Sequence, residues 1–190
     1  FQEIPTDRNA QEQLQRLAPK LGRWKEVAHL VGDYLDGELG NTDDVLEVVR
    51  LAAVIADSQL GDREAARKYY RRYLDAQAGD TRASALFEGA LERWEEWEEL
   101  RDFLDEQATR AETPEGRIAY LHRSASVSEE KLSDEDRAIS TMQGILEVEP
   151  SDAVATSQLE RLLRQTNRWS DLRDHLLSTL ERETDRRQQD

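Results

Sequence analysis

The sequence contains no cysteine, and its 190 residues include only nine glycines and four prolines. Without cysteine, the chain has no disulfide framework, no thiolate metal ligand and no cysteine nucleophile. No apolar run approaches the roughly 18 residues of a membrane-spanning helix, so we expect no membrane insertion. The first residues do not show the pattern of a signal peptide. The absence of cysteine fits the cytoplasm, which we favour, and also the periplasm.

Basic residues are scarce as well. Lys and Arg number 26 against 41 Asp and Glu, which gives a net charge of −15. Proteins that bind nucleic acid need clustered Lys and Arg, so we do not expect DNA or RNA as the main partner. The low apolar content of 37% could indicate disorder, but Leu, Ala, Val, Ile and Trp recur with a helical period. The composition therefore favours an all-α chain.

An internal repeat is marked by three tryptophans. Trp24, Trp97 and Trp169 lie 73 and 72 residues apart. A second type of segment lies between them, in which Gly61-Asp62 matches Ser133-Asp134, again 72 residues apart. Because the two types interleave, the basic repeat is about 36 residues long and occurs five times.

A repeat of this length holds two helices of about 14 residues and two short turns. We predict helices over 9–21, 24–38, 43–60, 62–77, 81–94, 96–111, 114–132, 134–148, 152–166 and 168–184. They form five repeats, about 9–41, 42–79, 80–112, 113–150 and 151–184, within a single domain over 1–190. Residues 1–8 and 181–190 are predicted to be frayed. The start at Phe1 suggests a fragment of a longer chain.

The pattern resembles the tetratricopeptide repeat (TPR) family. In the repeat over 113–150, the resemblance rests on Ser133-Asp134, Ala138, Met142, Ile145, Leu146 and Pro150. In the repeat over 42–79, it rests on Gly61-Asp62, Ala66, Tyr70, Tyr73 and Leu74. The tryptophan repeats depart from the family, since Val27, Leu100 and Leu172 replace its small alanine. The resemblance implies a right-handed α-solenoid of about five antiparallel hairpins that serves as a protein-interaction scaffold without catalysis.

In the resembling family, the first helix of each pair lines a concave groove. Carrying the groove-facing spacing onto this chain gives more basic than acidic residues, and the candidate partner-binding residues are Arg16, Lys20, Arg82, Arg93, Tyr120, Arg123, Lys131, Arg161 and Arg164. A basic groove inside an acidic shell would attract an acidic protein or peptide. The alternative is that these cations pair with carboxylates of adjacent helices.

Other candidate sites have simpler interpretations. Trp at one fixed repeat position is expected to pack a turn on its neighbour, whereas Trp94 breaks the repeat and is expected to be the most exposed of the four. Tyr70 and Tyr73 are expected to pack inside the fold. The histidines have no metal-ligand spacing, and no phosphate loop or nucleophile motif is present. We therefore expect no metal, no cofactor and no enzymatic activity.

The leading hypothesis is a scaffold that binds a peptide, a tail or a partner helix in its groove. A structural segment of a longer array, which associates end to end with other copies, is the alternative. An RNA-binding helical repeat is a third hypothesis, which the net charge disfavours.

Overall fold

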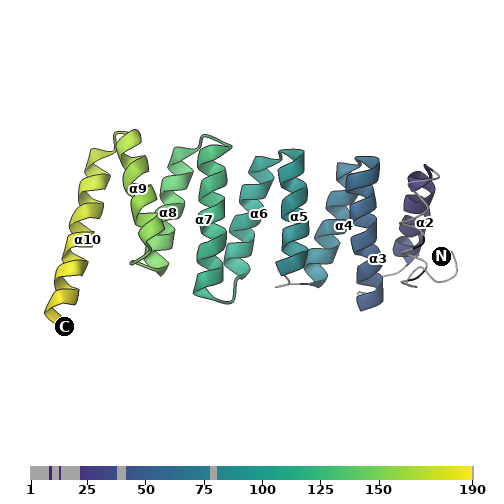
Figure 1. Cartoon of the computed structure of the whole chain (residues 1–190), viewed down its shortest axis with the longest axis horizontal. Coiled ribbons are helices and arrows are strands. Elements are labelled where there is room, and N and C mark those ends of the chain that lie inside the picture. The colour runs from purple at the N-terminus through teal and green to yellow at the C-terminus, as the bar shows by residue number, and fades with distance from the viewer. Residues whose placement is uncertain (1–8, 10–12, 14–21, 38–41, 78–80, 190) are drawn as a thin grey trace. The chain divides into compact units, whose positions relative to one another are not determined.

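The computed structural model describes residues 22–37, 42–77 and 81–189, together with Asn9 and Gln13. The elements in this part are α2 (Trp24–Gly37), α3 (Asp43–Val54), the π-helix η1 (Ile55–Leu60), α4 (Arg63–Ala76), α5 (Thr81–Trp94), α6 (Trp97–Arg110), α7 (Pro114–Glu130), α8 (Glu135–Val148), α9 (Ala153–Gln165) and α10 (Trp169–Gln189) (Figure 1). All regular structure in these ranges is helical, so the all-α prediction is confirmed. The predicted helix over 9–21 lies outside the described residues except at Asn9 and Gln13.

The helices form two compact units, residues 1–94 and residues 95–190, which divide within the third predicted repeat. In the first unit, each of α2, α3 and α4 packs on the helix that follows it. In the second unit, the same holds for α6, α7, α8 and α9. Figure 1 shows consecutive helices running in opposite directions within each unit. The prediction of stacked antiparallel hairpins is therefore confirmed within each unit.

The turns that lead into α2, α4, α6, α8 and α10 have the same backbone conformation. Each contains a residue with a positive φ angle, and these residues are Gly22, Gly61, Glu95, Ser133 and Asn167. Their spacing reproduces the alternating repeat of the sequence. Two of the turns continue with an aspartate cap: Asp62 accepts the N–H of Ala65 at 3.0 Å, and Asp134 accepts the N–H of Arg137 at 3.0 Å. The repeat is thus visible as a repeated turn.

The positions that carry the TPR resemblance lie in the core. Ala66, Tyr70 and Tyr73 are buried in the first unit, which confirms the expected inward packing of the two tyrosines. Ala138 and Ile145 are buried in the second unit, among side chains of α7, α8 and α9. The resemblance is therefore confirmed in the packing of both units. None of the described helices is long and apolar enough to cross a bilayer.

Two tryptophans differ from expectation. Trp94 is only 7% exposed, so the expectation that it is the most exposed of the four tryptophans was wrong. Its indole N–H donates to Asp57 of the π-helix η1 at 2.8 Å. Trp169 is 59% exposed, unlike the half-buried Trp24 and Trp97. Repeat position alone therefore does not determine the burial of a tryptophan.

The last helix also extends further than expected. The sequence predicted a frayed segment over 181–190, but α10 continues to Gln189. The segment is polar, yet it consists largely of Glu, Arg and Gln, which have high helix propensity. A helix can thus persist there without an apolar stripe.

Candidate functional site

The predicted partner-binding residues lie on three helices of the described structure. Arg82 and Arg93 belong to α5 in the first unit. In the second unit, α7 carries Tyr120 and Arg123 and is followed by Lys131, while α9 carries Arg161 and Arg164. The other two, Arg16 and Lys20, lie outside the described residues.

Several of these cations already have intramolecular partners. Arg93 pairs with the carboxylate of Asp57. Arg161 donates to Glu129 at 2.6 Å, and the hydrogen bond to this carboxylate is the main cause that raises the pKa of Arg161. These carboxylates neutralise the charges of Arg93 and Arg161, as expected if the groove cations pair with carboxylates of adjacent helices.

Two more cations of the predicted set also have close neighbours. Arg164 pairs with Glu160 at 2.7 Å, one turn earlier on α9. The ammonium of Lys131 lies 5.0 Å from the ring centroid of Trp97, within range of a cation–π contact. Lys131 therefore contacts the beginning of α6.

The acidic partners follow a spacing that the sequence analysis missed. Asp105 pairs with Arg137, Glu129 with Arg161, and Asp136 with Arg168, in each case across 32 residues. Each of these ion pairs therefore joins residues of two consecutive repeats. A search for acids followed by Arg at slightly less than one repeat would have found all three pairs.

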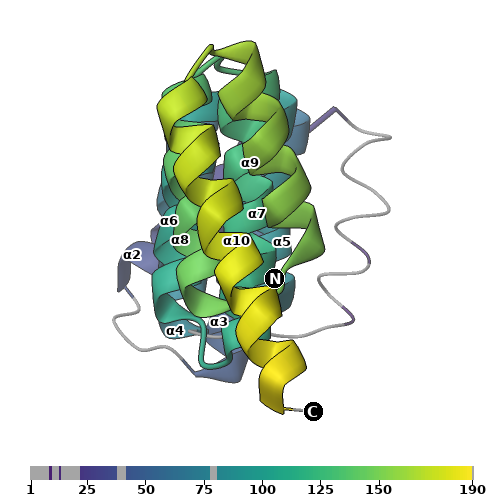
Figure 2. The same ribbon diagram turned by 90° about the vertical axis from the view of Figure 1, so that its left-hand side faces the viewer.

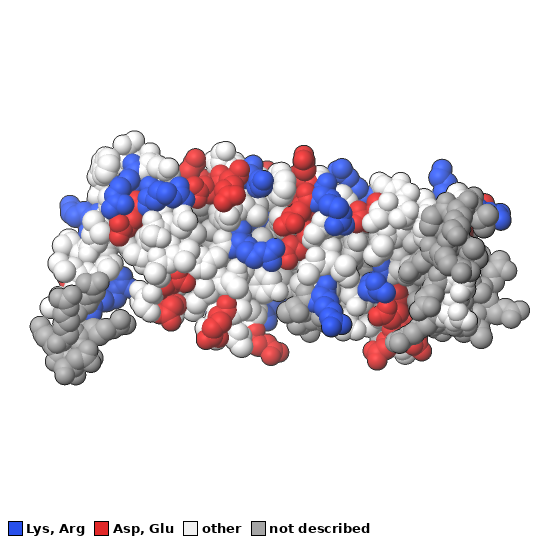
Figure 3. All heavy atoms as spheres, viewed as in Figure 1, with Lys and Arg blue, Asp and Glu red and all other residues white. Residues whose placement is uncertain are grey.

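One pocket of the second unit lies at the predicted groove. Its volume is about 230 Å³, and it is lined by His122, Ser126, Glu129, Glu130, Met142, Val154, Gln158 and Arg161. We call this set the α7/α9 face, because all of its residues except Met142 belong to those two helices. Of the predicted binding residues that the structure describes, Arg161 lines this pocket. Over the second unit, Figure 3 shows basic and acidic side chains next to one another.

The α7/α9 face combines an apolar spot with ordered polar groups. Val154 is 56% exposed at the start of α9, whereas Met142 is buried beneath the face. His122 lies 3.1 Å from the carboxylate of Asp152. Burial alone would raise the pKa of Asp152, but the N–H of Ala155 and the imidazole of His122 together lower it below its usual value. The carboxylate therefore stays ionised and holds the imidazole in place.

A larger cleft of about 780 Å³, which was not predicted from the sequence, lies between α8 and α10. Its walls include the charged side chains of Glu147, Asp174 and Arg182 together with the apolar Leu146 and Leu159. His175 lies at its edge with a buried Nε2 atom, and burial lowers the pKa of this imidazole. No group of three or more His, Asp or Glu side chains in the described ranges is arranged to hold a metal ion.

No protein-family model matches the chain, and no curated protein matches it significantly in sequence. Among solved structures, MamA 41-end from Desulfovibrio magneticus RS-1 is 13% identical over 92% of this chain and 93% of its own, with a TM-score of 0.43. The TPR-like repeats of a putative kinesin light chain from Podosopora anserina are 14% identical over 93% and 95%, with a TM-score of 0.45. PilF of Pseudomonas aeruginosa is 17% identical over 95% and 77%, with a TM-score of 0.44. The chain is similar to these proteins, and its own hairpins and turns carry the fold assignment.

Proposed function

We propose that this chain is a non-catalytic protein-interaction scaffold whose α7/α9 face binds a peptide, a tail or a partner helix. The observation that carries the proposal is the pocket on this face. It joins two side chains of α9, the exposed apolar Val154 and the charged Arg161, to polar side chains of α7. Convergent apolar and charged groups of this kind are suited to recognition.

The size of the pocket favours a side chain of a polypeptide over a free small molecule. Pockets for small molecules usually measure about 300–1,000 Å³, and the present one is smaller. An apolar side chain of the partner would contact Val154 at the rim and reach towards Met142. The rest of the peptide would extend along α7 and α9.

The charge of the partner follows from Arg161. Its side chain is 39% exposed, and that of Glu129 is 26% exposed. A pair this accessible to water contributes little to stability, so a carboxylate of the partner can replace Glu129 at small cost. The guanidinium would then bind that carboxylate through two parallel hydrogen bonds. We therefore expect an apolar residue close to Asp or Glu in the bound segment.

Selection from a random peptide library tests the proposal directly. Peptides that bind the wild-type chain are expected to share an apolar residue next to an acidic one. The Arg161→Glu and Val154→Asp variants should each weaken binding of a selected peptide about tenfold or more, which corresponds to about 1.4 kcal/mol.

Arg110→Glu is the matched control. Arg110 ends α6 and also pairs with a glutamate one turn earlier, but it does not line the pocket. This variant should bind the peptide within about twofold of the wild type, since exposed charges at a distance are screened. Circular dichroism checks that all three variants keep their helices. If the two pocket variants bind as tightly as the control, the α7/α9 face is not the binding site.

A further inference from the structure

His122 lines the pocket of the α7/α9 face, and its two ring nitrogens have different surroundings. The Nε2 atom lies 3.1 Å from the Oδ2 atom of Asp152, which precedes α9. The Nδ1 atom makes no hydrogen bond within the described ranges. It is not among the buried polar atoms that lack a partner there, so it reaches the surface. Figure 2 views the second unit from α10 and shows α7, which carries His122, on the same side as α9.

Asp152 acts on two groups at once. Its Oδ1 atom accepts the N–H of Ala155 at 2.7 Å and so caps α9, while its Oδ2 atom faces His122. Burial raises the pKa of Asp152, but the hydrogen bonds with the N–H of Ala155 and with His122 outweigh this effect and lower the pKa below its usual value. An ionised carboxylate can only accept hydrogen bonds. The proton between the two side chains therefore belongs to Nε2 of His122.

The position of this proton determines what the other ring nitrogen can do. In a neutral imidazole one nitrogen donates and the other accepts, so a proton on Nε2 leaves Nδ1 as an acceptor. Carboxylates fix the tautomer of a histidine in this way in metal sites and in hydrolases. His122 therefore carries an accessible hydrogen-bond acceptor beside the pocket that it lines.

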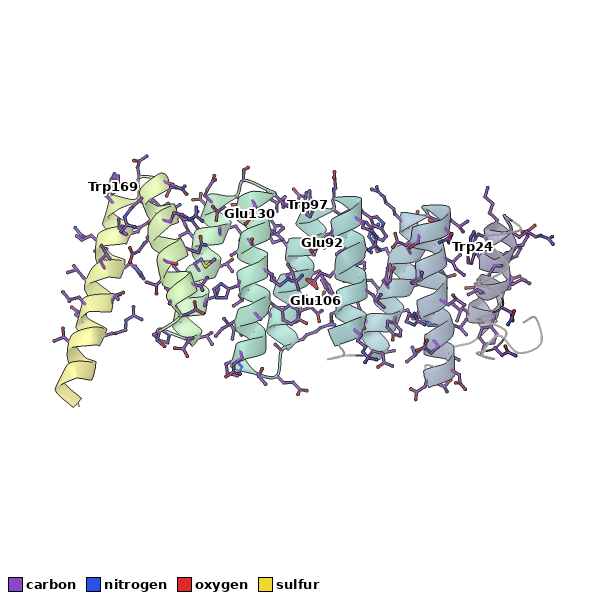
Figure 4. All side chains as sticks on the ribbon, viewed as in Figure 1. Trp24, Glu92, Trp97, Glu106, Glu130 and Trp169 are labelled. Carbon is purple, nitrogen blue, oxygen red and sulfur yellow. The ribbon has the colours of Figure 1, made fainter. Side chains whose placement is uncertain are left out.

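Other acceptors of the pocket are already used. Ser126 donates to Glu130 at 2.9 Å, and Figure 4 marks this glutamate near the end of α7. Arg161 donates to Glu129 at 2.6 Å and to the side-chain oxygen of Gln158 at 3.1 Å. The Nδ1 atom of the imidazole differs from these oxygens, because no donor of the described structure pairs with it. A donor of the bound segment can therefore pair with Nδ1 without displacing an existing contact.

We propose that His122 is a specificity-determining residue of the α7/α9 face, whose Nδ1 atom accepts a hydrogen bond from an N–H or O–H group of the bound segment. Asp152 is the positioning residue that fixes the tautomer. The inference rests on the proposed function of this face, and it adds a hydrogen-bond donor to the apolar and acidic groups expected in the segment. A site built to accept a hydrogen bond discriminates against ligands without the donor, because its acceptor is then left unpaired.

NMR of the imidazole nitrogens tests the tautomer in the full chain without any ligand. At about pH 8, where imidazoles are mostly neutral, the wild type should carry the proton of His122 on Nε2. Asp152→Asn should move it to Nδ1. Asparagine keeps the cap of α9 through its oxygen, which leaves the amide nitrogen to donate to Nε2. A wild-type chain with the proton on Nδ1 would overturn the proposal, whether or not a peptide binds.

Peptide binding tests the role of the acceptor. Asp152→Asn and His122→Phe should each weaken binding of a library-selected peptide about tenfold or more, since both remove the acceptor. Loss of a negative charge would by itself strengthen binding of an acidic peptide. Weaker binding by Asp152→Asn therefore has the sign that the tautomer predicts and the opposite sign to a charge effect.

Asp134→Asn is the matched control. Asp134 caps α8 through the N–H of Arg137, but its ion-pair partner is Arg101 instead of a histidine, and it does not line the pocket. This variant should bind within about twofold of the wild type. Circular dichroism checks that all variants keep their helices.

Two outcomes separate this inference from the proposed function. An Asp152→Asn variant that has the reversed tautomer and binds the peptide as tightly as the control would overturn the role of His122, while the face would still bind peptides. A wild-type chain that has the expected tautomer and binds no library peptide would overturn the proposed function, and the role of His122 in binding with it.

Discussion

Asp57 offers the sharpest test of how the first unit is held together. Its side chain is 4% exposed and accepts hydrogen bonds from the indole of Trp94 at 2.8 Å and the hydroxyl of Tyr70 at 3.2 Å. Arg93 pairs with the same carboxylate. The π-helix η1, α4 and α5 are thus joined through one acceptor.

The cost of Asp57→Ala can be worked out donor by donor. The indole N–H of Trp94 would lose its acceptor at a buried position, which costs about 1–3 kcal/mol. The hydroxyl of Tyr70 would lose about 0.5–1.5 kcal/mol. The side chain of Arg93 is 56% exposed and regains water, so its share is small. We expect the free energy of unfolding of the first unit to fall by about 2–4 kcal/mol.

Urea unfolding, followed by tryptophan fluorescence and circular dichroism, measures this change. Asp36→Ala is a matched control in the same unit, because Asp36 also faces a cation, Lys68, but is 77% exposed. It should change the free energy by less than about 0.5 kcal/mol. If Asp57→Ala proves no more destabilising than Asp36→Ala, the carboxylate does not hold the three helices together.

Four further predictions concern the pH dependence, two turns and one helix cap. Burial, followed by the negative charge of Asp57, raises the pKa of Tyr70 to about 12 from an unfolded value near 10. The protonated hydroxyl therefore stabilises the folded state fully below pH 10, and this stabilisation is lost as the pH rises to 12. Tyr70→Phe should therefore lose about 2–3 kcal/mol less than the wild type over that window, measured by urea unfolding at both pH values. Ser133→Gly should raise the free energy of unfolding of the second unit by about 0.5–1 kcal/mol, because glycine adopts the φ angle of 52° at this position without the strain that serine has there. Gly61→Ala should lower the free energy of unfolding of the first unit by about 1 kcal/mol. The cost comes from its φ angle of 66°, which strains a residue with a Cβ, and not from a clash, because no atom lies within 4 Å of the added Cβ. Thr113→Ala should cost about 1 kcal/mol, because Thr113 accepts the N–H of Gly116 at 3.1 Å and caps α7. Calorimetry should find Ser133→Gly more stable than the wild type, and Gly61→Ala and Thr113→Ala less stable. Any other order would show that the φ angles of the two turns and the cap of α7 do not determine these stabilities.

The sequence predicted the described helices well because turns and caps are local. Asp62 and Asp134 cap helices in the same way, and the two residue pairs that contain them revealed the repeat. The conformation of Glu95 and Asn167 could be inferred only by aligning their turns with Gly22 and Gly61. Local chemistry therefore determined where the helices begin and end.

Features that depend on neighbouring helices were harder to predict. Trp94 was expected to be the most exposed of the four tryptophans, but a carboxylate 37 residues earlier in the chain accepts its indole N–H. The described cations of the predicted groove belong to α5, to α9 and to α7 with the residue that follows it, and the carboxylate that holds Arg161 comes from the preceding hairpin, which the sequence pattern did not predict. A sequence pattern shows which positions of the repeats are equivalent, whereas the burial of a side chain and its ion pairs depend on the side chains of the neighbouring helices.

The central claim is that the second unit binds a polypeptide segment on its α7/α9 face. Titration of the isotope-labelled full chain with a library-selected peptide, followed by NMR of the backbone amides, tests this claim most directly. The account predicts that the signals of Ser126, Val154 and Arg161 shift with increasing peptide, while those of Gln143 and Ser178 in the α8/α10 cleft stay in place. Shifts confined to the α8/α10 cleft, or an absence of shifts at saturating peptide, would contradict it.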